Sequence, residues 1–279
     1  MGSALPHLTL FPPAAKATAE GCRALMTDES RETGPWIRRF HPAPEARTRL
    51  VCFPHAGGSA TYYFPVSRAL SPAVDVLAIQ YPGRQDRRHE PCVEDIEELA
   101  DLVVGELDSW RDLPLTLFGH SMGATLAFEV ARRLEARGTP PGTLFASGRR
   151  APSRVRDERV HQAGDDRLIA DITQLSGTDS AVLGDPEILR MILPAIRSDY
   201  KAAETYRYRP GPPLGVDVVA LVGDADQQVT VDEAEAWREH TTASFELRVF
   251  PGGHFFLDSH VATVLDLIRA RTSALTVGS

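Results

Sequence analysis

Cysteine is scarce in this chain of 279 residues, which contains only Cys22, Cys52 and Cys92. No two of them stand close together in the sequence, and no Cys-X-X-Cys pair occurs. An odd and sparse set of this kind excludes a disulfide framework and is typical of a reducing compartment. Cys52 stands in an apolar run and is expected to be a core residue.

A surplus of basic residues is also lacking, since the formal net charge is -8. Binding to nucleic acid requires basic side chains that neutralise phosphates, so the composition excludes a general nucleic-acid binder. No apolar stretch approaches the roughly 18 residues that a membrane span needs. The N-terminus lacks the basic region of a signal peptide. We therefore expect a cytoplasmic protein with no nucleic-acid partner and no membrane partner.

What the sequence does contain is enough apolar material for a sizeable core, because 43% of its residues are hydrophobic. Residues 1–34 show no usable periodicity and predict a flexible N-terminal extension. Residues 35–279 have the length of a single α/β enzyme domain.

Short apolar runs alternate with longer segments of helical period from residue 49 onward, which indicates a mostly parallel sheet flanked by helices. Each run is bounded by Gly, Pro, Asp or His and is typical of a strand buried on both faces. The six predicted strands cover 50–53, 74–79, 115–118, 143–146, 216–222 and 245–250.

Helices are predicted between these strands from apolar residues spaced by three and four. They cover 93–110, 122–135 and 258–270. Residues 148–210 contain no convincing strand, only helical patterns near 166–175, 186–193 and 197–206. A segment of this length is too long for a plain loop, so we expect a helical lid inserted over one end of the sheet. The alternative is a small second domain with no part in the active site.

The strongest single motif is Gly-His-Ser-Met-Gly at 119–123, which matches the pattern G-x-S-x-G. It follows a predicted strand and precedes a predicted helix, which is the context of the nucleophile turn of the α/β-hydrolase fold. The small flanking residues permit a sharp turn that exposes Ser121 at a helix N-terminus, where developing negative charge is favoured. Ser121 is the predicted nucleophile, and His120 is expected to support the site rather than act as base.

A serine hydroxyl needs a base, and the base needs a partner that fixes its tautomer. In this fold the order along the chain is Ser, then Asp or Glu, then His. His254 follows the last predicted strand on a glycine-containing loop, whereas His260 lies in the opening turn of the last helix. Asp226 and Asp224 both follow the strand before it, and we favour Asp226 because the turn needs two or three residues to return toward the serine. Asp224 is expected to shape the turn.

The tetrahedral intermediate of acyl transfer carries an oxyanion that fixed N–H groups must stabilise. The N–H of Met122, directly after the nucleophile, is one predicted donor. The glycine-rich loop after the first predicted strand should supply the second, from Ala56 or alternatively from Gly57. This chemistry requires no cofactor and no metal.

Several separated segments together resemble the type II, or editing, thioesterases that serve polyketide and non-ribosomal peptide synthases. The resemblance extends from about Trp36 to the last predicted helix. It is carried by FPHAGGS at 53–59, QYPGR at 80–84, GHSMG at 119–123, SDY at 198–200 and GGHF at 252–255.

The resemblance implies a hydrolase that removes stalled or incorrect acyl groups from the phosphopantetheine thiol of acyl or peptidyl carrier proteins, with 148–210 as its lid. A monomer is expected. Carrier domains are usually acidic, so a basic approach is expected on this acidic protein. Two groups of arginines, at 149–159 and at 84–88, are candidates for it, with solvated arginines that bind no partner as the alternative.

Three other functions share parts of this pattern. A general carboxylesterase would use the same three catalytic residues. An acyltransferase with a similar serine motif would lack the late Asp-then-His order. A non-catalytic binding protein of the same fold would not need a catalytic residue at every catalytic position. In this sequence all three positions are filled.

Overall fold

The structure is a computed structural model that describes residues 34–176 and 186–277. The predicted flexible extension, except for Gly34, lies outside the described residues, and so does Cys22. The core is one seven-stranded sheet with the strand order β1-β3-β2-β4-β5-β6-β7. The strands are β1 (Ile37–Arg38), β2 (Arg49–Phe53), β3 (Asp75–Ile79), β4 (Leu115–His120), β5 (Thr143–Ser147), β6 (Asp217–Gly223) and β7 (Phe245–Phe250).

The prediction of a mostly parallel sheet is confirmed. All six predicted strands are present, and they pair in parallel with one another. The exception is β1, which pairs antiparallel with β3 at the sheet edge. We did not predict β1, because two residues are too few to show any periodicity. Strands β4 and β5 run further than predicted, so that their last residues, His120 and Ser147, pair with each other.

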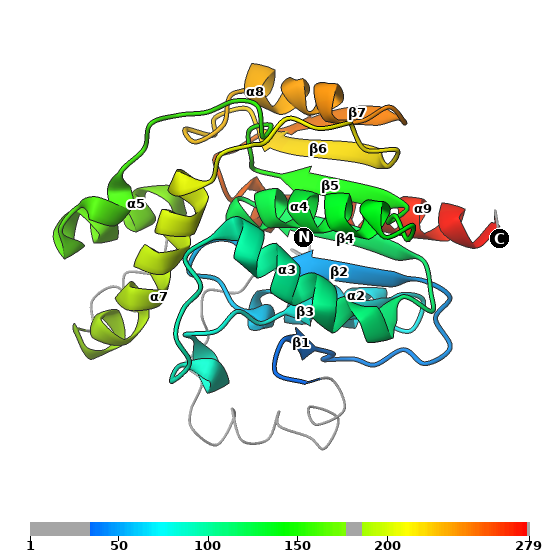
Figure 1. The fold of residues 1–279 in the computed structure, drawn as a ribbon, viewed down its shortest axis with the longest axis horizontal. Helices are drawn as coiled ribbons and strands as arrows, with labels where there is room; N and C mark the ends of the chain where they lie inside the picture. Colours follow the sequence, from blue (N-terminus) through cyan, green and yellow to red (C-terminus); the bar gives the residue numbers. More distant parts are fainter. Residues whose placement is uncertain (1–33, 177–185, 278–279) are drawn as a thin grey trace, which may run out of the picture.

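Helices cover both faces of the sheet (Figure 1). One face packs against α3 (Ile96–Leu107) and α4 (Met122–Ala136), and the other packs against α2 (Phe64–Leu70) and α9 (Val261–Val277). Successive residues of one strand point to opposite faces, and in β2 Val51 joins the first core while Leu50 joins the second. The strands are therefore buried on both sides, as expected for parallel strands.

Two helix boundaries differ from the predicted ones for local reasons. The segment predicted as a helix over 93–110 becomes α3 only at Ile96, because Asp95 caps it by accepting the Glu98 N–H at 2.9 Å. The last helix begins at Val261 rather than at 258, since a short 3₁₀ turn occupies Phe256–Ser259.

The segment 148–210 contains helices and no strand among its described residues. Its helices are α5 (Asp165–Ser176) and α7 (Pro186–Thr205), which lie beyond the ends of the parallel strands in Figure 1. We predicted two helices where α7 is one, and that prediction was wrong. Pro194 lies inside α7, yet the apolar face continues through it. That face packs with α5 in a separate cluster formed by Leu189, Leu193 and Ile196 on α7 and by Leu168 on α5.

A short helix, α8 (Val231–Glu235), follows β6 and begins with a capping box between Thr230 and Glu233. No helix in the described ranges is long and apolar enough to cross a lipid bilayer.

Candidate active site

The turn that carries Ser121 joins the end of β4 to the start of α4. Ser121 has φ 54° and ψ -122°, a conformation that a residue with a side chain adopts only under strain. Its N–H donates to the carbonyl of Ser147 at 2.8 Å, which ties the turn to the end of β5. The half-buried serine therefore lies at the carboxyl edge of the sheet, at the N-terminus of a helix.

The glycines of the motif are required because the backbones approach closely here. A Cβ on Gly119 would lie 2.1 Å from the carbonyl oxygen of Gly123. A Cβ on Gly123 would lie 2.1 Å from the carbonyl oxygen of Phe53, at the end of β2. The start of α4 thus sits directly against the loop that follows β2.

Gly123→Ala is expected to lower the free energy of unfolding by about 3 kcal/mol or more, since rigid backbone atoms must move to admit the methyl group. Gly105→Ala is the matched control, because Gly105 lies exposed in α3 with no atom within 4 Å of an added Cβ. That change should raise the free energy of unfolding by about 0.5 to 1 kcal/mol, as alanine is the better helix former. Urea unfolding of both variants measures the two effects, and equal effects would contradict the close approach described here.

His254 and Asp226 form a buried pair. The Nδ1–H group of His254 donates to Oδ2 of Asp226 at 2.9 Å, and the two side chains are 4% and 0% exposed. The other carboxylate oxygen, Oδ1, accepts the N–H of Gln228 at 2.8 Å. The carboxylate is thus held on both sides and presents a fixed acceptor to the imidazole, which keeps the proton on Nδ1 and leaves Nε2 as the basic nitrogen.

The alternative residues have other partners. Asp224 is exposed, and its Oδ1 accepts the N–H of Gly252 at 2.9 Å, so it shapes the turn. His260 has its Nε2 at 2.8 Å from the carbonyl oxygen of Pro251. Among the four candidates, only Asp226 and His254 contact each other in the structure.

His120 connects the serine turn to His254. Its ring centroid lies 5.0 Å from that of His254, and its Nδ1 lies 3.0 Å from the hydroxyl of Ser147. Burial, helped by the neighbouring His254 and His55, lowers the pKa of His120 well below its usual value. The neutral ring packs beside His254 and is the direct neighbour of Ser121 in the chain. No hydrogen bond joins Ser121 Oγ to His254 within the described residues, and such bonds often tighten only when substrate binds.

The two predicted oxyanion donors, the N–H groups of Met122 and Ala56, have no acceptor among the described residues. Met122 is the first residue of α4, so its N–H has no acceptor within the helix. In the loop after β2, the N–H of Gly58 donates to the carbonyl of His55 at 2.9 Å, and the N–H of Gly57 donates to Oδ2 of Asp199 at 2.7 Å. The hydrogen bonds of the described residues leave the Ala56 N–H unused. This arrangement favours Ala56 over Gly57 as the second donor.

The arginines at 149–159 are mostly paired with carboxylates, a feature that sequence alone does not show. Each of these pairs is 2.5 to 2.9 Å long: Arg150 with Glu158, Arg154 with Glu239, Arg156 with Glu233 and Arg159 with Asp157. In the second group, Arg84 pairs with Asp199 and Arg87 with Glu90, while Arg88 is exposed. These two groups of arginines therefore do not form a strongly basic surface that would guide an acidic carrier.

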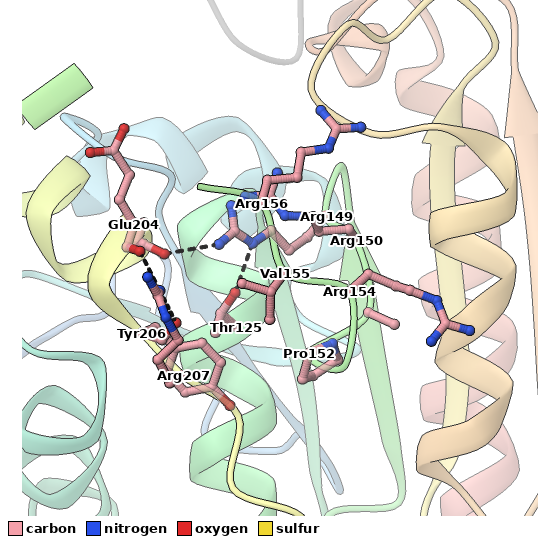
Figure 2. A pocket seen from close by; sticks show the side chains of 12 residues that line it. Thr125, Arg149, Arg150, Pro152, Arg154, Val155, Arg156, Glu204, Tyr206 and Arg207 are labelled. Carbon is pink, nitrogen blue, oxygen red and sulfur yellow. Dashed lines mark hydrogen bonds between the residues drawn. The ribbon is translucent and has the colours of Figure 1, made fainter. Parts of the chain in front are cut away.

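Arg149 lines a pocket between α4 and the end of α7, together with Arg150, Arg154 and Arg156 (Figure 2). Its guanidinium donates to the Thr125 hydroxyl at 2.9 Å and to the Ala203 carbonyl at 3.2 Å. Burial and the neighbouring Arg150 lower the pKa of Arg149 to about 10, so it remains a cation at neutral pH.

The seven-stranded, mostly parallel sheet is that of the α/β-hydrolases, and a serine turn and a buried Asp–His pair meet at its carboxyl edge. A model of the thioesterase domain matches residues 48–272, so the chain belongs to the thioesterase domain family.

Known relatives are similar along most of the chain. A probable cadicidin biosynthesis thioesterase of Streptomyces griseus is 56% identical over 229 residues, which are 82% of this chain but only 63% of that protein. Thioesterase PikA5 of Streptomyces venezuelae is 54% identical over 237 residues, which are 84% of each chain. The solved structure of the type II thioesterase BorB from the borrelidin biosynthetic cluster has a TM-score of 0.81 and 54% identity, covering 85% of this chain and 97% of that one.

Proposed function

We propose that this protein is an editing thioesterase, which hydrolyses acyl groups from the phosphopantetheine thiol of acyl or peptidyl carrier proteins. The hydrolytic chemistry is supported above all by the hydrogen bond between His254 and Asp226, buried beside the serine turn. The substrate class is supported by the relatives. All three are named as thioesterases, one of them for cadicidin biosynthesis and one, of type II, from the borrelidin biosynthetic cluster.

In the proposed acylation step, Ser121 Oγ attacks the thioester carbonyl while Nε2 of His254 takes its proton. Asp226 orients the imidazole and stabilises the imidazolium, but keeps its own charge. The carbonyl oxygen becomes an oxyanion, which accepts hydrogen bonds from the N–H groups of Met122 and Ala56. The tetrahedral intermediate then collapses, the carbon–sulfur bond breaks, and the departing thiolate takes the proton from His254.

In the proposed deacylation step, water attacks the acyl ester on Ser121. His254 accepts a proton from that water, and the same two N–H groups stabilise the second oxyanion. Collapse of this intermediate breaks the ester bond, returns the proton to Ser121 and releases the acid. No cofactor and no metal takes part.

We assign the described helices of segment 148–210, α5 and α7, to a helical lid over this site. Support comes from their place beyond the carboxyl ends of the strands and from the contact of α7 with the loop after β2, where Asp199 accepts the Gly57 N–H. The proposal also includes a monomeric state and a cytoplasmic location, and the mass of the purified protein in solution tests the first of these.

The deciding experiment compares acyl carrier proteins loaded with acetyl, propionyl or longer acyl groups with simple esters of the same acids. We expect the wild-type protein to release acid from the loaded carriers with the higher kcat/KM, since binding energy from the carrier and its arm can be used in the transition state. Release is followed by mass spectrometry of the carrier. Hydrolysis of the simple esters without any action on the carriers would identify a general carboxylesterase instead.

A further inference from the structure

Two of the sequence segments that carry the family resemblance have no part in the chemistry above. They are QYPGR at 80–84 and SDY at 198–200, and the structure joins them through Arg84 and Asp199. The guanidinium donates to both carboxylate oxygens of Asp199, at 2.6 and 2.7 Å. The two side chains are only 8% and 2% exposed.

Both members of the pair also hold the backbone of the loop after β2. Asp199 accepts the N–H of Gly57 at 2.7 Å. Arg84 donates to the carbonyl oxygen of Gly58 at 3.0 Å. Gly57 has φ 77°, and a Cβ there would lie 2.8 Å from Ile196 on α7, so the helix rests directly on the loop.

These bonds determine where the oxyanion donors point. The Gly58 N–H bonds to the His55 carbonyl, and in a trans peptide the Ala56 N–H points opposite to that carbonyl. The Ala56 N–H is thereby directed away from the turn. Asp199 occupies the competing Gly57 N–H and fixes the peptide that follows Ala56. If this loop could rotate freely, the Ala56 N–H would point in many directions. Stabilisation of an oxyanion needs a donor whose direction is fixed before the reaction.

The presence of an ion pair, rather than apolar side chains, supports a role in fixing the direction of the Ala56 N–H. A buried ion pair is a weak way to gain stability, because removing two charges from water offsets most of their attraction. Apolar residues could attach α7 to the sheet equally well. Apolar residues could neither accept a hydrogen bond from the Gly57 N–H nor donate one to the Gly58 carbonyl. Because the carboxylate is charged, its hydrogen bond with the Gly57 N–H is stronger than one to a neutral acceptor.

We propose that Arg84 and Asp199 are positioning residues that fix the oxyanion donor of Ala56, and that Asp199 makes this donor depend on the place of helix α7. The inference rests on the proposed hydrolase function. Neither residue touches the substrate. Instead, a shift of α7 moves Asp199 and loosens the loop, so the oxyanion site is complete only when the helix is seated.

The test uses Asp199→Ala and Asp199→Asn in the full-length protein, with an activated acetyl ester as substrate and an alkyl trifluoromethyl ketone as inhibitor. The ketone forms a tetrahedral adduct with the serine and therefore reports on the oxyanion site. We expect kcat to fall about 100-fold in Asp199→Ala and about 10-fold in Asp199→Asn, which keeps one acceptor oxygen. The affinity for the ketone should fall by similar factors, and KM for the ester should stay within about threefold, because the ground-state carbonyl depends less on these donors.

Lys201→Met is the matched control. Lys201 lies on the same helix and pairs with Glu94 at the surface, and no side-chain hydrogen bond or ion pair among the described residues joins it to the loop after β2. This variant should keep the wild-type kcat and ketone affinity. A second variant, Arg84→Met with Asp199→Leu, leaves no unpaired charge behind and so guards against simple unfolding. It should fold cooperatively and still show the loss in kcat.

Wild-type kcat and ketone affinity in the folded double variant would overturn the proposal. The proposal would also be overturned if the loss of kcat in the variants followed their loss of thermal stability alone and disappeared when the assay was cooled. A wild-type protein that cleaves the ester but ignores acyl carriers would refute the substrate assignment and leave this inference standing. A wild-type protein inert to both ester and ketone would refute the two together.

Discussion

Replacing Ser121 with alanine is expected to reduce kcat by roughly 10⁴- to 10⁶-fold, the range seen when a serine nucleophile is removed. The change deletes one oxygen and keeps Cβ, so the strained turn at φ 54° remains as it was. The melting temperature should therefore stay within about 2 °C of the wild-type value. Turnover of an acyl carrier and thermal unfolding, measured on the same preparation, separate loss of chemistry from loss of fold.

The structure provides a sharp control for this experiment. Ser153 also faces a histidine, with its Oγ at 2.9 Å from Nε2 of His240, in the segment that follows β5. That serine lies on no strand-to-helix turn. Ser153→Ala should keep the wild-type kcat, and a fluorophosphonate probe should label the wild-type protein at Ser121 only. Labelling that persists in Ser121→Ala, or activity above about a hundredth of wild type, would contradict the assignment.

The serine turn could be predicted from the sequence because its causes are local. A buried apolar strand, two glycines around a serine and a helical period follow one another within a few residues, and each has a direct steric reason. The six parallel strands could be predicted for a similar reason, since strands buried on both faces produce continuous apolar runs. In contrast, β1 has only two residues and is held by its pairing with β3.

The choice between Asp226 and Asp224 needed three-dimensional information. Both carboxylates follow the same strand, and turn length alone favours the later one without excluding the earlier one. What distinguishes them is the place of the loop that carries His254, which brings the imidazole to Asp226 and the Gly252 N–H to Asp224. The choice between Ala56 and Gly57 is similar, because it depends on Asp199, 142 residues away in the chain.

Charge patterns proved the least informative part of the sequence. The arginines at 149–159 form a dense basic group along the chain, but two of their four carboxylate partners, Glu233 and Glu239, come from a distant segment. Arg84 likewise pairs with a residue 115 positions away. A local count of basic residues cannot show such pairing, and so it cannot show whether an acidic partner would meet a free cation.

Asp226→Asn is expected to reduce kcat about 10⁴-fold, the size that this change has in a serine protease. The reason lies in the second hydrogen bond of the carboxylate. The Gln228 N–H donates to Oδ1 at 2.8 Å, so an asparagine will keep its carbonyl oxygen there and turn its NH₂ group toward His254. Nδ1 of the imidazole must then accept, and its proton moves to Nε2, the nitrogen that has to take the proton of Ser121. KM should change little, because the substrate does not contact Asp226.

Asp224→Asn provides the matched comparison, with the same chemical change two residues earlier. Its Oδ1 accepts the Gly252 N–H at the exposed end of the turn, and an amide oxygen can accept that bond equally well. We expect kcat within about threefold of wild type. Steady-state kinetics on a loaded carrier, with circular dichroism to verify folding, measures both variants. If Asp224→Asn were the inactive one, the orienting carboxylate would have to be reassigned. If both variants kept full activity, the buried Asp–His pair would be structural rather than catalytic, and the serine would need another base.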